Sequence, residues 1–171
     1  MQGLCKFNYA NKKKNNMSKI PISWKTTTYG RVYTLEETLY SFLNQDYDGP
    51  KEMIIVNDCP FQTLIFNHPD VKIYNLKDTF PQIGLKENFA VSKCNYSTIY
   101  VGDDDDIGLP TLLSQVNKYF PGNQLLHWSS GIAMVGHKIR AIENIGNCGI
   151  VFDREFIKEK IGTYYPIEHE G

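Results

Sequence analysis

Residues 97–110 read Ser97-Thr-Ile-Tyr-Val-Gly-Asp-Asp-Asp-Asp-Ile-Gly-Leu-Pro110 and join a short apolar strand to four consecutive aspartates. Adjacent carboxylates repel one another, so folding alone gives little reason to place them together at the end of a buried strand. A hard divalent cation explains the run, because oxygen ligands suit Mg²⁺ or Mn²⁺. One carboxylate can hold the metal while another holds a ribose hydroxyl or a metal-bound water. The alternative is a solvated acidic turn that caps the following helix; an EF-hand is disfavoured because its spacing and central glycine are missing.

Apolar strands and amphipathic helices alternate on both sides of this stretch, which predicts an α/β fold with a mixed, mostly parallel sheet and helices on both faces. Residues 35–43 have helical periodicity, with Thr34 as the expected N-cap and Glu37 as its capping-box partner. Helices are also expected at 84–94, from Pro110 to about 120, and at 154–161. Strands are expected at 20–24, 53–56, 71–74, 97–101, 125–128 and 149–152, with a hairpin or strand pair over 130–141.

Polar clusters follow three of the predicted strands, at 26–31, 57–58 and 103–106. The first is expected to form a turn. Ligands of open α/β sheets bind beyond the carboxyl ends of the strands. We therefore expect the three clusters to converge on one edge of the sheet.

The composition is that of a soluble globular domain and limits the possible partners. The chain has 171 residues with a formal net charge of −1, which gives no electrostatic reason to expect nucleic acid. It contains no apolar run long enough for a transmembrane helix. Residues 1–18 are expected to be a polar tail and 19–171 the folded domain. The cysteines at 5, 59, 94 and 148 form no C-x-x-C pair, which favours a reducing cytoplasm.

Four segments in order resemble the family 2 glycosyltransferases, which have the GT-A (Rossmann-like) fold. Residues 100–110 resemble their DXD region, and 28–31, Thr-Tyr-Gly-Arg, resemble the Thr-Tyr-Asn-Arg turn after the first strand. Residues 43–47, Leu-Asn-Gln-Asp-Tyr, and 54–58, Ile-Ile-Val-Asn-Asp, resemble the "L-x-Q-x-Y … I-I-V-N-D-G-S" stretch, and 83–88 resemble "G-x-K-x-N". The match covers roughly residues 20–112; Cys59-Pro60 replaces the usual Gly-Ser, which could alter the loop around the base.

This resemblance implies a role for each matched polar residue. Asp58 would accept a hydrogen bond from the N–H of a uracil-type base, and Thr28 and Tyr29 would contact the base. Lys86 would lie near the diphosphate, while Arg31 would either approach the nucleotide or be solvated. Asp105 would be the principal ligand of Mn²⁺ or Mg²⁺, and Asp103 would bind the metal or the ribose. Asp104 and Asp106 are supporting candidates, the first toward the nucleotide-sugar and the second toward the metal.

The resemblance also implies inversion at the anomeric carbon, with an Asp or Glu removing the proton of the acceptor hydroxyl. Residues 152–164 resemble the strand–helix unit that precedes this carboxylate in the family. Glu168 and Glu170 are the candidates for the base, although the family's Glu-Asp pair is absent and both could belong to a frayed terminus. The chain is short for the family, which is consistent with a domain truncated at its C-terminus.

Three functions follow as hypotheses. The first is a metal-dependent, inverting glycosyltransferase that moves a sugar from a nucleotide-diphosphate sugar, a UDP-sugar by preference, to a glycan or other hydroxyl acceptor, as in polysaccharide biosynthesis. The second is a sugar-nucleotidyltransferase, disfavoured because only Gly30-Arg31 stands where a Gly-rich basic phosphate loop belongs. The third is a catalytically silent module that binds a nucleotide-sugar.

Overall fold

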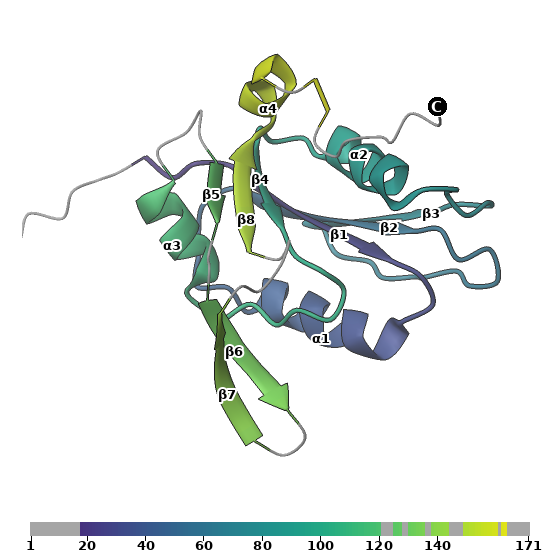
Figure 1. Cartoon of the computed structure of the whole chain (residues 1–171), viewed down its shortest axis with the longest axis horizontal. Coiled ribbons are helices and arrows are strands. Elements are labelled where there is room, and N and C mark those ends of the chain that lie inside the picture. Colours follow the sequence, from purple (N-terminus) through teal and green to yellow (C-terminus); the bar gives the residue numbers. More distant parts are fainter. Residues whose placement is uncertain are drawn as a thin grey trace, which may run out of the picture.

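The computed structural model describes residues 18–120, 125–127, 130–135, 138–143, 149–160 and 162–163. A six-stranded sheet forms the centre of the molecule (Figure 1). Its strands are β1 (Ile22–Thr28), β2 (Lys51–Asn57), β3 (Val71–Asn75), β4 (Thr98–Val101), β5 (Leu125–His127) and β8 (Ile150–Asp153). The helices are α1 (Val32–Leu43), α2 (Ile83–Lys93), α3 (Leu112–Tyr119) and α4 (Arg154–Lys160). The expected hairpin is also present, as β6 (Ser130–Val135) and β7 (Lys138–Glu143).

The strand order β3-β2-β1-β4-β8-β5 makes the sheet mixed and mostly parallel, as predicted. β1 pairs in parallel with both β2 and β4, and β2 pairs in parallel with β3. β8 runs antiparallel to both of its neighbours, β4 and β5. The chain leaves β1 toward β2 and β3 and later returns to place β4 on the other side of β1. The point between β1 and β4 is therefore a topological switch point, where ligands of open α/β sheets bind.

Helices cover both faces of the sheet, as the continuous apolar strands predicted (Figure 1). Successive side chains of a strand point to opposite faces. Thus Trp24 and Ile55 pack with Phe42 of α1 and Leu113 of α3 on one face. On the other face, Ile54 and Val56 share a cluster with residues of α2 and α4: Ala90, Val91 and Ile157. The predicted α/β fold is confirmed.

Two local expectations about the first βα connection were wrong. Residues 26–28 belong to β1 and not to a turn, because β-branched threonine suits a strand and because all three pair with β2, Thr28 opposite Asn57. α1 begins at Val32, with Arg31 and not Thr34 at the N-cap. Gly30, with φ of 74°, turns the chain sharply out of β1, so that the Leu35 N–H already donates to the Arg31 carbonyl at 3.1 Å.

In the part of the chain that the structure describes, none of the helices has the length and apolar character that crossing a bilayer requires. The tail predicted over 1–18 lies outside the described residues apart from residue 18.

The core position of Phe42 yields a stability prediction. Its side chain is fully buried and meets the Trp24 ring edge-on at a centroid distance of 5.9 Å. Phe42→Ala is expected to lower the free energy of unfolding by about 3–5 kcal/mol, since the cavity left behind cannot close completely. Tyr40→Ala, on the same helix at a side chain 68% exposed, is the control and is expected to change it by less than about 0.5 kcal/mol. Equal losses in urea unfolding would contradict the assignment of Phe42 to the core.

Candidate functional site

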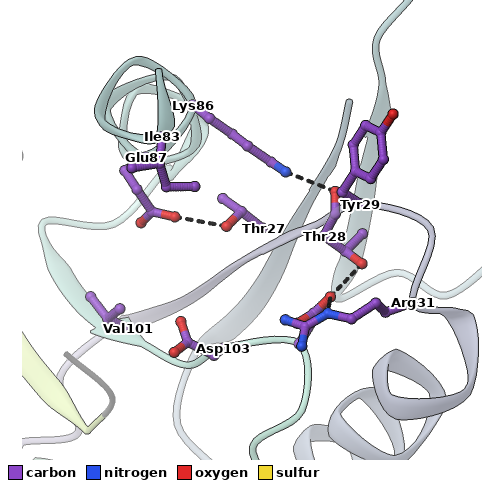
Figure 2. Close-up of a pocket in the computed structure, with 10 residues that line it drawn as sticks. Thr27, Thr28, Tyr29, Arg31, Ile83, Lys86, Glu87, Val101 and Asp103 are labelled. Carbon is purple, nitrogen blue, oxygen red and sulfur yellow. Dashed lines mark hydrogen bonds and ion pairs between the residues drawn. The ribbon is translucent and has the colours of Figure 1, made fainter. Parts of the chain in front are cut away.

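A cavity of about 300 Å³ lies at the carboxyl ends of β1 and β4, at the switch point of the sheet. Figure 2 shows that its walls come from the end of β1, from the first turn of α2 and from the aspartate run after β4. The lining residues are Thr27, Thr28, Tyr29, Arg31, Ile83, Lys86, Glu87, Val101, Asp103 and Asp104. The polar clusters at 26–31 and 103–106 therefore converge on this cavity.

Asp104 is fully buried and joins the end of β1 to the aspartate run. It accepts a hydrogen bond from the Thr28 hydroxyl at 2.5 Å and from the Arg31 Nε at 3.1 Å. Arg31 also donates from Nη1 to Asp105 Oδ2 at 2.9 Å. Partial burial lowers the pKa of Arg31, but the two carboxylates outweigh it and raise the pKa above its ordinary value. Arg31 thus remains positively charged and bridges the buried Asp104 and the exposed Asp105.

Two hydrogen bonds between Asp103 and Asp106 close a turn. The Asp106 N–H donates to the Asp103 carbonyl at 3.2 Å, and the Asp103 N–H donates to Asp106 Oδ2 at 3.1 Å. Figure 2 shows Asp103 across the cavity from Lys86 and Glu87. Burial raises the pKa of Asp103, and the neighbouring positive charge of Lys25 opposes this effect. The half-buried carboxylate of Asp103 lines the cavity, whereas Asp105 is exposed and is not among the lining residues.

Lys86 reaches from α2 to the end of β1. Its ammonium group donates to the Thr28 carbonyl at 2.8 Å and lies 2.5 Å from Asp58 Oδ1. The second oxygen of Asp58 accepts the Phe80 N–H at 3.0 Å, and the Asp58 side chain is almost completely buried. In this structure, therefore, Asp58 holds Lys86 in place from behind the cavity wall. Its contact with a nucleotide base stays a prediction.

A buried ion pair next to the cavity was not predicted from the sequence. Lys25, in the middle of β1, is fully buried and pairs with Glu87 of α2. The other oxygen of Glu87 accepts the Thr27 hydroxyl at 2.7 Å (Figure 2). Burial lowers the pKa of Lys25 to about 8, and the negative charge of Asp103 offsets part of the effect. The sequence does contain a signal for this pair, because Lys25 stands between Trp24 and Thr26 in an otherwise buried strand. Lysine is almost never buried without a partner.

The residue types at the cavity include the oxygen ligands that a divalent cation takes. Carboxylates outnumber cations among the lining residues, and the aspartate run offers only oxygen ligands, which Mg²⁺ and Mn²⁺ prefer. Over the described residues, three or more His, Cys, Asp or Glu side chains nowhere gather into a group that could hold a metal ion. The assignment of Asp103, Asp105 and Asp106 as metal ligands stays a prediction.

The structure thus brings most of the predicted site residues together. Those that line the cavity are Thr28, Tyr29, Arg31, Lys86, Asp103 and Asp104. Asp105 and Asp106 lie on the same loop, and Asp58 lies behind Lys86. The two candidates for the catalytic base, Glu168 and Glu170, lie outside the described residues.

The chain is similar in sequence to the O-antigen biosynthesis glycosyltransferase WbnJ of Escherichia coli. The two are 37% identical over 126 residues, which make up 70% of this chain and 43% of WbnJ. The chain thus spans less than half the length of this relative. A comparison with models of protein families finds no match.

Among solved structures, the fold is similar to that of TarS from S. aureus. Residues 1–349 of TarS match with a TM-score of 0.55 and 14% identity, over 82% of this chain and 49% of that one. The same TarS fragment in complex with UDP-GlcNAc matches with a TM-score of 0.57 and 14% identity, over 82% of this chain and 47% of that one. At this level of identity the likeness shows the fold: this chain has the GT-A-like α/β fold that its sequence predicted.

The Lys25–Glu87 pair makes a stability prediction. Lys25→Met removes the cation and leaves Glu87 buried without its charge partner, which is expected to cost about 3–5 kcal/mol in the free energy of unfolding. Adding Glu87→Leu removes the stranded charge, so the double variant is expected to recover most of that loss. Chemical denaturation of the three proteins measures both effects. A double variant that is no more stable than the single one would contradict this account.

Proposed function

We propose that this chain acts as a glycosyltransferase that binds UDP-sugars and uses them as donors. The observation that carries the proposal is the cavity at the switch point, where Lys86 and Arg31 face the aspartate run. The named activity of WbnJ and the complexes of TarS with UDP-GlcNAc and UDP support it. From the name of WbnJ we further propose that the acceptor is a glycan of the kind assembled in surface polysaccharides. The cysteine pattern, which lacks a C-x-x-C pair, supports a place in the cytoplasm in this proposal.

In this proposal each wall of the cavity binds a different part of the donor. Tyr29 is 49% exposed at the end of β1 and stacks on the base beside Thr28. Lys86, held by Asp58 and the Thr28 carbonyl, faces the diphosphate with a compact positive charge. Asp58 itself binds the N–H of the base once the donor draws Lys86 toward its phosphates.

Asp105 and Asp103 hold the cation in this proposal, with Asp106 supporting their turn. Bound there, Mn²⁺ or Mg²⁺ supplies charge neutralisation of the leaving diphosphate. Asp105 is paired with Arg31 in the structure, so Arg31 must release it when a metal binds. The Nη1 group of Arg31 is then available to a phosphate oxygen, while Nε and Nη2 stay bound to Asp104.

The reaction in this proposal is a direct displacement that inverts the anomeric carbon. The acceptor oxygen attacks that carbon, the bond to the diphosphate breaks, and a carboxylate takes the acceptor proton. Glu168 and Glu170 remain the candidates for that base. Asp104 holds Thr28 and Arg31 in position from beneath the donor.

Binding of UDP tests the site directly. Calorimetric titration is expected to show that Mn²⁺ strengthens UDP binding and that Asp105→Ala largely abolishes this gain, because the principal metal ligand is lost. Asp48→Ala is the matched control, since Asp48 is also an exposed aspartate in an ion pair, with Lys19. UDP binding that is equal with and without metal, or equal in Asp105→Ala and the control, would contradict the proposed metal site.

Product analysis tests the type of reaction. Incubation with a UDP-sugar and Mn²⁺ is expected to release UDP, faster when a glycan acceptor is present. Formation of pyrophosphate from a sugar phosphate and UTP would instead indicate a nucleotidyltransferase. Metal-dependent UDP binding without release from any UDP-sugar would contradict the proposed activity of this chain and indicate a nucleotide-sugar-binding module.

A further inference from the structure

The aspartate loop, residues 103–107, is fixed at both ends against one tryptophan. A Cβ added to Gly102, before the loop, would lie 2.5 Å from Trp24 Nε1. A Cβ added to Gly108, after the loop, would lie 2.5 Å from Trp24 Cη2. Trp24 is fully buried and is itself held edge-on by Tyr100 and Phe42, at centroid distances of 4.6 and 5.9 Å. Both ends of the loop therefore pack closely against one buried ring.

The upstream end is also bonded to the sheet. The Thr26 hydroxyl donates to the Gly102 carbonyl at 2.8 Å, and the Gly102 N–H donates to the Lys25 carbonyl at 3.2 Å. The loop therefore starts from the central strand of the sheet, which is a rigid support.

The downstream end depends on the side chains of α1 and the residues just after it. The Ser41 hydroxyl accepts the Gly108 N–H at 3.1 Å. Gln45, which is nearly fully buried, donates from Nε2 to the Leu109 carbonyl at 2.8 Å and accepts the Leu113 N–H at Oε1 at 2.9 Å. One glutamine side chain thus ties the segment after the loop to the first turn of α3. The backbone adds one further bond, from the Asp46 N–H to the Pro110 carbonyl at 2.8 Å.

Such anchoring matters because the loop carries four carboxylates that repel one another. Repulsion drives the aspartates apart unless the backbone at both ends resists it, and metal ligands must be held within about 0.5 Å of their working geometry. The upstream end is held by main-chain and hydroxyl bonds to β1. At the downstream end, Gln45 supplies both a donor and an acceptor to the backbone.

We infer that Gln45 is a positioning residue that holds the aspartate loop in the geometry for binding the metal and the nucleotide. Its part in metal and nucleotide binding rests on the proposed function. Gln45 is not among the residues that line the cavity, so it acts only through the backbone of residues 108–113. The structure thereby gives a role to the glutamine of the Leu43–Tyr47 segment, which the sequence singled out without assigning a function to it.

The test compares Gln45→Met with Glu52→Gln. Methionine keeps the length and volume of glutamine and removes both hydrogen bonds to residues 109 and 113. Glu52 is a buried group of similar size near the opposite end of the strands, where it accepts the Ser23 hydroxyl at 2.7 Å and the Asn95 Nδ2 at 2.7 Å. Its substitution disturbs a buried hydrogen-bond network without touching the aspartate loop, which controls for a general loss of stability.

Two readouts are taken on the full chain, after thermal unfolding has measured the stability of each variant. In Gln45→Met, amide hydrogen exchange of residues 102–108 is expected to speed up by about tenfold or more relative to the wild type, and in Glu52→Gln it is expected to stay unchanged. The affinity for UDP with Mn²⁺ is expected to fall by about tenfold, which equals about 1.4 kcal/mol, in Gln45→Met alone. If Gln45→Met does not fold, Ser41→Ala removes the single bond to the Gly108 N–H and is expected to change both readouts in the same direction.

Unchanged exchange in Gln45→Met, or the same acceleration in Glu52→Gln, would overturn the positioning role. Faster exchange without any loss of UDP affinity would overturn the link between loop geometry and binding. Failure of the proposed function would give a different result, because the wild type would then bind no UDP. The hydrogen-exchange comparison would still show whether Gln45 positions the loop.

Discussion

Four carboxylates follow one another at the end of β4, and the structure around the site is arranged to hold them together against their repulsion. Asp104 is buried against Thr28 and Arg31, and Arg31 reaches on to Asp105. The charge of Lys25 opposes the rise in the pKa of Asp103. Each of these partners comes from β1 or from the turn after it, so the end of β1 and the aspartate run form one electrostatic unit. A divalent cation bound to a diphosphate completes that unit in the proposed function.

The core and the site are connected through Trp24. Its ring belongs to the cluster between the sheet and α1 and α3, and both ends of the aspartate loop rest on it. Glycine fits at positions 102 and 108, whereas a side chain at either position would collide with this ring. The geometry of the loop is therefore a consequence of core packing, to which α1 adds the hydrogen bonds of Gln45.

The order of the elements and the convergence of the polar clusters were predictable, because continuous apolar strands alternate with amphipathic helices and because parallel strands end at one edge. The pairing of charges was not predictable from the sequence. Lys86 was expected to face a diphosphate, yet in the structure it also binds Asp58, a residue expected to face the base. Lys25 and Glu87 lie 62 positions apart and meet only because α2 packs on β1. Local patterns carry no information about such contacts. The β1 boundary was misplaced for a different reason. β-Branched threonine favours a strand, but the three threonines were grouped with the polar residues of the turn that follows.

Nuclear magnetic resonance with a paramagnetic ion tests most directly whether this cavity binds a metal–nucleotide complex. Spectra of the protein with UDP and Mn²⁺ would be compared with spectra recorded with UDP and diamagnetic Mg²⁺. The account predicts selective broadening of the amide signals of residues 27–31, 83–87 and 102–106, which surround the cavity. Broadening that is uniform, or that centres on residues 51–53 and 95–98 at the opposite ends of the strands, would contradict it.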